Sequence, residues 1–213
     1  MRLALALFLL PTTAIAHPHV FVDATVEVIF DDQNRVTGLR IGWTYDDLFS
    51  LMIIEDRGLD PDYDNILTDD AKAQLAGFDM QWDAGYPGDT YALMGDNALV
   101  LSGPSEFTGS FADGKITSTH LRTFDPPVVI GADPLVIQVY DPTYYSSYAI
   151  MGLPTLTGAT GCTAQVFEPD AAVAEAIYLE AVGQMDAQML ETGGFPEIGA
   201  AYAVEARVTC GAQ

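Results

Sequence analysis

Positive charge is scarce in this sequence. Only 8 of the 213 residues are Lys or Arg, against 30 Asp and Glu, and the net charge is −22. A chain with so few cations has no basic stripe to neutralise phosphates, which counts against nucleic-acid binding. The same shortage counts against docking on an anionic membrane surface. The acidity does not by itself establish cation binding, because acidic surfaces commonly serve solubility.

Long hydrophobic runs are also lacking. The apolar stretch over residues 3–10 is short; it follows Arg2 and precedes Ala14-Ile15-Ala16. A basic start, a short apolar run and a small-x-small site are typical of a cleaved secretory signal peptide. No later stretch reaches the roughly 18 apolar residues that a transmembrane helix needs. We therefore expect a signal peptide over residues 1–16, one periplasmic domain over residues 17–213, and no direct membrane insertion after cleavage.

Cysteine is rare as well, since the chain contains only Cys162 and Cys210. In an exported protein an even, small number of cysteines predicts a disulfide bond. The alternative is a thiolate metal site, but the close Cys-x-x-Cys spacing of such sites is missing. We therefore predict that Cys162 and Cys210 are bonded to each other.

Strand patterns dominate the first part of the mature chain. Residues 20–30 and 36–45 alternate apolar with polar or small side chains, and an Asp- and Asn-rich turn separates them, which predicts a β-hairpin. Asp46 or Asp47 can then cap a short helix over residues 48–55. Thr68 can cap a second helix over residues 71–78.

The rest of the chain continues this mixed pattern. Short strands are expected over residues 118–124, 135–140 and 204–209. Residues 170–191 are expected to form an amphipathic helix with Val173, Ile177, Ala181, Met185 and Met189 on its apolar face. The sequence therefore predicts an α+β fold: a mainly antiparallel β-sheet or sandwich with helical insertions and a C-terminal amphipathic helix.

Histidine is limited to three residues, two of which form His17-Pro18-His19 at the expected mature N-terminus. On an extended segment, residues two apart point to the same face, so both imidazoles can converge on one ion. Cleavage before His17 also frees an α-amine. The amino-terminal copper chelate that uses deprotonated backbone amides is excluded, because Pro18 has no amide proton.

His120, on the strand expected over residues 118–124, is the candidate third ligand, and Asp141 and Asp23 are candidate carboxylate neighbours. Three imidazoles with a water or a carboxylate suit Zn²⁺, and Ni²⁺ or Cu²⁺ accept the same ligand types. Two alternatives stay open. His17 and His19 could form a solvated terminus with no ligand role, and His120 could simply be a half-exposed strand residue.

Two other kinds of site are not expected. Asp60, Asp62 and Asp64 have the spacing of the first three ligands of a calcium loop, but Ala71 stands where a bidentate Glu belongs. We therefore do not expect tight calcium binding. The sequence also contains no GxSxG, HExxH, Walker loop or GxGxxG after a strand, so we do not expect an enzyme.

Several segments, in order, resemble one family. They are His17-Pro18-His19-Val20-Phe21, Gly42-Trp43-Thr44-Tyr45-Asp46-Asp47 running into Phe49-Ser50, Tyr140-Asp141-Pro142-Thr143-Tyr144-Tyr145, and Val208-Thr209-Cys210. The chain thus resembles the periplasmic family called domain of unknown function one thousand and seven, described as the periplasmic component of an uncharacterised transport system. Its members are associated with nickel/cobalt-type permeases, and some take part in zinc uptake.

The resemblance implies a periplasmic metal-binding partner of an inner-membrane metal permease, and it covers His17, His19 and the Asp141 segment. The sequence departs from the family in its weaker acidic loop, and it lacks the His-rich tract of many zinc-delivery proteins. Our hypothesis is a non-enzymatic protein that binds a transition metal, zinc first, and serves that permease. The alternatives are a structural or assembly subunit of the transporter with no metal site, and a copper enzyme that uses the N-terminal His.

Overall fold

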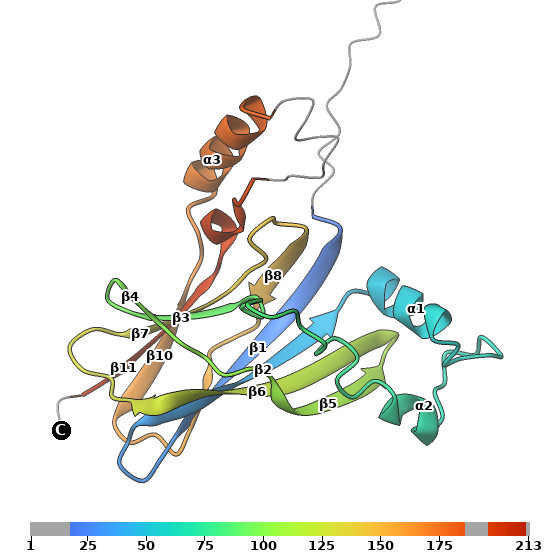
Figure 1. Ribbon diagram of the computed structural model, residues 1–213, viewed down its shortest axis with the longest axis horizontal. Helices are drawn as coiled ribbons and strands as arrows, with labels where there is room; N and C mark the ends of the chain where they lie inside the picture. The colour runs from blue at the N-terminus through green and yellow to red at the C-terminus, as the bar shows by residue number, and fades with distance from the viewer. Residues whose placement is uncertain (1–17, 186–195, 212–213) are drawn as a thin grey trace, which may run out of the picture.

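Two β-sheets that share one hydrophobic core form the body of the protein (Figure 1). The computed structural model describes residues 18–185 and 196–211, so the expected signal peptide and His17 lie outside the described residues. The strand order of the first sheet is β5-β6-β2-β1-β8, and β9 also pairs with β1. This sheet consists of β1 (Val20–Phe30), β2 (Val36–Tyr45), β5 (Ser105–Ala112), β6 (Lys115–Val128), β8 (Ser146–Ile150) and β9 (Thr155–Thr157).

The second sheet has the strand order β10-β11-β7-β3-β4. It consists of β3 (Thr90–Met94), β4 (Asn97–Leu99), β7 (Leu135–Val139), β10 (Cys162–Phe167) and β11 (Glu205–Cys210). Neighbouring strands are antiparallel in both sheets, except that β1 runs parallel to β8 and β9. The predicted α+β fold with a mainly antiparallel sheet is confirmed.

The alternation in β1 determines which side chains face the core. Every second residue from Val20 to Phe30 is buried, and the residues between them face outward or are partly exposed. This follows from the pleat, which directs successive side chains to opposite faces of the sheet. Val26 pairs with Ile41 of β2, which in turn pairs with His120 of β6. His120 therefore lies on the inner face of the sheet, in register with the buried side of β1.

The helices lie in the connections between strands. They are α1 (Asp47–Asp56), α2 (Asp69–Ala73), α3 (Ala171–Gly183) and the 3₁₀ helix η1 (Gly199–Tyr202). Figure 1 shows α1 and α2 beside β5 and β6, and α3 with η1 at another end of the molecule. Asp46 caps α1 by accepting a hydrogen bond from the Phe49 amide, one of the two caps that the sequence allowed. Over the described residues, no helix is both long and apolar enough to cross a membrane.

Two helix predictions need correction. The helix expected over residues 71–78 is shorter, because α2 ends at Ala73 and Gly77 adopts a left-handed φ of +71°. The helix expected over residues 170–191 begins at Ala171, with Asp170 as its cap, and ends at Gly183, so Met185 follows the helix.

The predicted apolar face of that helix does not pack into the core. Val173 and Ile177 are 55% and 41% exposed, and Ala174 is the buried residue of α3. No residue of α3 belongs to the hydrophobic core cluster, and α3 packs against η1. Met189 lies outside the described residues.

The disulfide prediction is confirmed. Cys162 and Cys210 are bonded, and they are paired directly across β10 and β11 in the second sheet. A bridge of this kind indicates an oxidising compartment.

Candidate functional site

The first described residues of the chain are fixed at a corner where β1, the turn before β8 and the start of α1 meet. The His19 amide donates to the Tyr145 carbonyl at 2.8 Å. The Phe21 amide donates to Oδ2 of Asp46 at 2.7 Å, and the Asp46 amide donates to the Phe21 carbonyl at 2.9 Å. We call this region the N-terminal corner, defined by His19, Phe21, Asp46 and Tyr145.

A surface pocket of about 400 Å³ lies at the N-terminal corner. It is lined by His19, Val20, Leu48, Phe49, Leu51, Met52, Glu55 and Tyr145. His19 is exposed, and its ring tilts against that of Tyr145 with 4.8 Å between the centroids. An imidazole and the Glu55 carboxylate therefore share a pocket with apolar walls. Glu55 was missed by the sequence analysis, because only the folded contact between α1 and β1 brings it there.

Asp141 has a structural task beside this corner. Its Oδ1 accepts from the amide and the hydroxyl of Thr143, both at 2.8 Å, and its Oδ2 accepts from the Ser146 amide at 3.0 Å. The Asp141 carbonyl lies so close to Gly199 that a Cβ at this position would sit 1.8 Å from it. Asp141 thus shapes the turn that holds Tyr145, and it is not among the residues lining the pocket.

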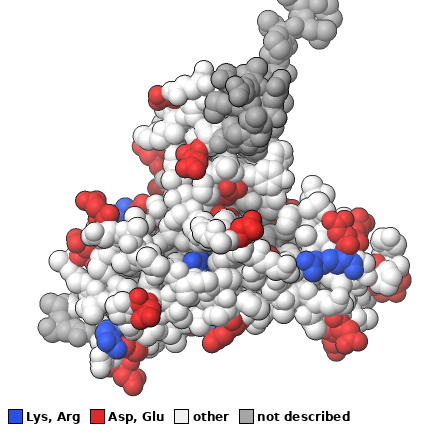
Figure 2. Space-filling model, viewed as in Figure 1, with Lys and Arg blue, Asp and Glu red and all other residues white. Residues whose placement is uncertain are grey.

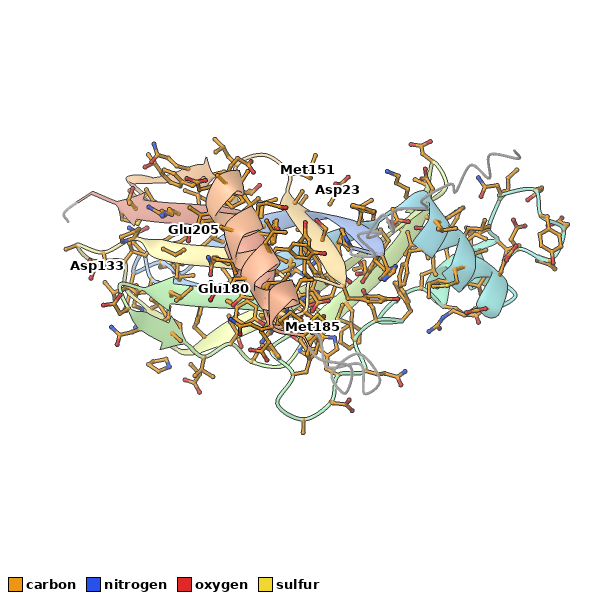
Figure 3. The ribbon with its side chains drawn as sticks, turned by 90° about the horizontal axis from the view of Figure 1, so that it is seen from above. Asp23, Asp133, Met151, Glu180, Met185 and Glu205 are labelled. Atoms are coloured by element: carbon orange, nitrogen blue, oxygen red, sulfur yellow. A yellow bond between two sulfur atoms is a disulfide. The ribbon has the colours of Figure 1, made fainter. Side chains whose placement is uncertain are left out.

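Asp23 lies on the outward side of β1, where its neighbours across the sheet are Thr44 and Ala149. In Figure 3 it lies near Met151, whose amide bonds to the carbonyl of Ala24. Four residues of extended chain separate it from His19, which corresponds to about 13 Å. The two side chains share a face of the strand, but the structure does not bring them together.

His120 lies on the opposite face of the sheet and is fully buried. Its ring meets the rings of Trp43 and Trp82 edge-on, with centroids 4.7 and 5.3 Å away. Neither ring nitrogen has a hydrogen-bond partner. Burial, together with the charge of Arg122, lowers the pKa of His120 to about 3. The structure therefore does not bring His120 to His19. His120 is fully buried, so the alternative of a half-exposed strand residue is also wrong.

The fold brings the three carboxylates of the acidic loop together, although the loop lacks the bidentate Glu of a calcium site. Carboxylate oxygens of Asp60, Asp62 and Asp64 lie within 4.8 Å of one another, the one such group of possible metal ligands over residues 18–185 and 196–211. Part of this geometry is internal, because Oδ2 of Asp60 accepts from the Asn65 amide at 2.9 Å. Ala71 is buried in α2 and supplies no carboxylate. Weak calcium binding at this loop stays a prediction.

Two buried acids were missed by the sequence analysis. Asp79 accepts hydrogen bonds from Tyr45 and Ser118 at 2.6 and 2.5 Å, and burial raises its pKa. Asp89 is 5% exposed and accepts from Tyr148 at 2.9 Å; burial raises its pKa to about 6. Both acids lie in the connection between α2 and β3, and among 30 acidic residues no sequence signal separates them from the exposed ones.

Acidic side chains are spread over the visible face of the molecule, and basic side chains are few there (Figure 2). The fold and the N-terminal corner define a disulfide-bridged, two-sheet α+β protein with an exposed imidazole at the start of its first strand. The chain belongs to the family described as protein of unknown function (DUF1007), whose model matches residues 2–210. The family resemblance noted in the sequence is thereby confirmed. A comparison with curated proteins gives no match.

Proposed function

We propose that the protein binds a transition metal ion, zinc first, at the N-terminal corner and serves an inner-membrane metal permease from the periplasm. The observation that carries the proposal is that exposed His19 shares a pocket with the Glu55 carboxylate. Imidazole nitrogen and carboxylate oxygen are both zinc ligands. A second imidazole, that of His17, precedes His19 by two residues along the chain. Nickel and copper accept the same donors.

The proposed ligand set differs from the one expected from sequence. His17 and His19 stay in it, and Glu55 takes the place of the carboxylate neighbours Asp141 and Asp23. His120 is left out, because an imidazole enclosed by two tryptophan rings on the inner face cannot reach a surface ion. A site open to solvent on a protein surface suits an ion that is handed on, and no catalytic role is proposed for it.

The apolar surface around His19 supports a partner protein at this corner. Leu48 is 75% exposed, and Leu51 and Met52 from the same helix are about half exposed beside it. Exposed apolar side chains gathered at a pocket commonly mark a protein interface. We propose the permease as the occupant, because an ion bound at His19 has to face its recipient. The disulfide and the apolar leader sequence support the periplasm as the location.

Zinc titration of the protein cleaved before His17 tests this proposal. We expect one ion per chain, and His19→Ala should weaken its binding at least about tenfold, since even loss of an outer partner costs that much. Glu55→Gln should weaken it in the same direction while keeping the size of the side chain. Competition with a chromophoric chelator measures both constants.

Matched controls come from the ligands that the structure sets aside. Asp23 lies on β1, which directly follows His19, and the Asp23→Asn variant should bind zinc like the wild type. The His120→Leu variant should do the same. An extra residue before His17 should weaken binding only if the α-amine is itself a ligand. If His19→Ala binds zinc as well as the wild type does, the metal proposal is wrong. The apolar corner then favours the transporter-subunit alternative.

A further inference from the structure

A second cavity, of about 750 Å³, lies along the second sheet beside β3 and β4. Its walls include four aromatic side chains, those of Trp82, Tyr86, Tyr91 and Tyr140. Tyr91 and Tyr140 stack with 4.1 Å between their ring centroids, which gives one wall a flat surface. The volume lies in the range of natural small-molecule sites, and aromatic walls are typical of them. None of its lining residues lines the pocket at the N-terminal corner.

Arg122 brings a buried positive charge to this cavity. The residue is 4% exposed and lines the cavity. Its Nε donates to the Ser102 carbonyl, its Nη1 donates to the Pro87 carbonyl at 2.8 Å, and the guanidinium lies 5.0 Å from the ring of Trp82. A guanidinium has five N–H groups. Two are used here, so three remain for a ligand.

The partners of buried Arg122 are neutral, as are those of exposed Arg57, whereas three other arginines have acidic partners. Arg35, Arg40 and Arg207 each form an ion pair with a carboxylate. No carboxylate of the described part of the chain pairs with Arg122, although the sequence holds 30 acidic residues. Burial of a charge is costly unless an opposite charge accompanies it. An anion in the cavity would supply that charge.

Thr90 also borders the cavity, but its hydroxyl is enclosed by protein atoms and is not open to a ligand. The residue is 3% exposed, and its hydroxyl has no hydrogen-bond partner. Buried hydroxyls normally find a partner, and an unpaired one costs free energy. A few placed polar groups within largely apolar walls are what orients a small ligand in a natural site, and Arg122 is the candidate for that role here.

We propose that this cavity binds a small organic carboxylate with a planar apolar body. The carboxylate accepts from the remaining N–H groups of Arg122, whose fork geometry matches two carboxylate oxygens. The planar body of the ligand lies among the aromatic side chains that line the cavity. This activity is separate from metal binding at the N-terminal corner, so either proposal can fail without the other.

Binding of benzoate to the full mature chain, without added metal, tests the proposal. Benzamide has the same shape but no charge, and acetate has the charge but no ring. We expect benzoate to bind in the millimolar range or better, to change the tryptophan emission and to raise the melting temperature. Benzamide should bind roughly tenfold more weakly or worse, because a charge-assisted hydrogen bond is lost. Acetate should be weaker than benzoate because it lacks the stacking surface.

A substitution that fills the cavity tests whether benzoate binds there, and it leaves Arg122 unchanged. Ala98 lines the cavity from the exposed edge strand β4, so Ala98→Phe should abolish benzoate binding and still fold. Ala112→Phe, on the exposed end of β5 outside the cavity, is the matched control and should bind benzoate like the wild type. Three results would overturn the proposal: no benzoate binding, equal binding of benzamide, or unchanged binding in Ala98→Phe.

Discussion

At the scale of single residues, His120 shows how strongly the two-sheet core controls a titratable group. The imidazole is enclosed by Trp43 and Trp82, and both of its nitrogens lack partners. The pKa of about 3 means that the folded protein keeps this side chain neutral at any pH near physiological. His120 therefore acts as an uncharged aromatic component of the core.

Replacement of His120 by Leu should change how stability depends on pH. The unfolded chain protonates this histidine below about pH 6.5, whereas the folded chain does not do so until about pH 3. Acidification from pH 7 to pH 5 therefore favours the unfolded wild type by about 2 kcal/mol at this residue. His120→Leu should lack that loss, and urea unfolding at both pH values measures it.

Asp89 has the opposite effect on the free energy of unfolding when the pH falls from 7 to 5. Its pKa of about 6 in the folded state lies above the unfolded value of 3.8, so protonation between these values stabilises the fold. The comparison must therefore be between wild type and His120→Leu, which both carry Asp89. Equal losses of stability in the two proteins on acidification would show that His120 is not kept neutral by the fold.

At the scale of elements, Asp46 connects α1 to β1 and so positions the candidate metal site. One of its carboxylate oxygens caps α1 at the Phe49 amide, and the other accepts from the Phe21 amide. Asp46→Ala should cost about 1–2 kcal/mol in the free energy of unfolding, the usual cost of a lost cap. It should also weaken zinc binding, because Glu55 lies on α1 and His19 precedes β1.

Asp170→Ala is the matched control for this prediction. Asp170 caps α3 through the amides of Ala172 and Val173, but no residue of α3 lines the pocket at the N-terminal corner. The control should lose a comparable cap and keep its zinc affinity. If both variants bind zinc equally well, Asp46 has no part in positioning the site.

The elements that the sequence predicted well are those with a local cause. β1 and β2 have the predicted bounds, because their alternation matches the pleat and an Asp- and Asn-rich turn joins them. β6 was harder to interpret, since its inward residues include Ser118, His120 and Arg122. Polar side chains on the inner face conceal the periodicity that normally identifies it. From the sequence, His120 was a candidate third ligand or a half-exposed strand residue, and the buried position was not predicted.

The residues of the candidate site could be predicted only in part, because contacts between segments distant in the sequence bring them together. His19 could be chosen from its residue type and its spacing from His17. Glu55 could not be chosen, because it lines the same pocket as His19 only in the fold, where Asp46 joins the start of α1 to Phe21 of β1. The cavity around Arg122 likewise combines β3, β4, β6 and β7, whose adjacency follows from the order of strands and not from sequence spacing.

At the scale of the whole molecule, the Cys162–Cys210 bridge closes a loop of 48 residues that includes α3. Replacement of both cysteines by Ser should lower the free energy of unfolding by about 4 kcal/mol, because the unfolded chain gains the entropy of the opened loop. The folded variant should retain its zinc affinity, because the bridge lies in the second sheet and His19 precedes the first. Denaturant unfolding and a zinc titration of the same sample check both parts. Wild-type stability in the double variant would contradict the prediction.

The parallel pairing of β1 with β8 determines when the N-terminal corner can form during biogenesis. The hairpin of β1 and β2 can fold as soon as its own residues are free, but the His19 amide has its partner at Tyr145. Joining parts so distant along the chain requires closure of a long loop, which is a slow, late event in folding. A chain in which β8 has not yet paired with β1 therefore has His19 without the corner around it. On the proposed function, metal loading at this corner therefore follows the folding of both sheets.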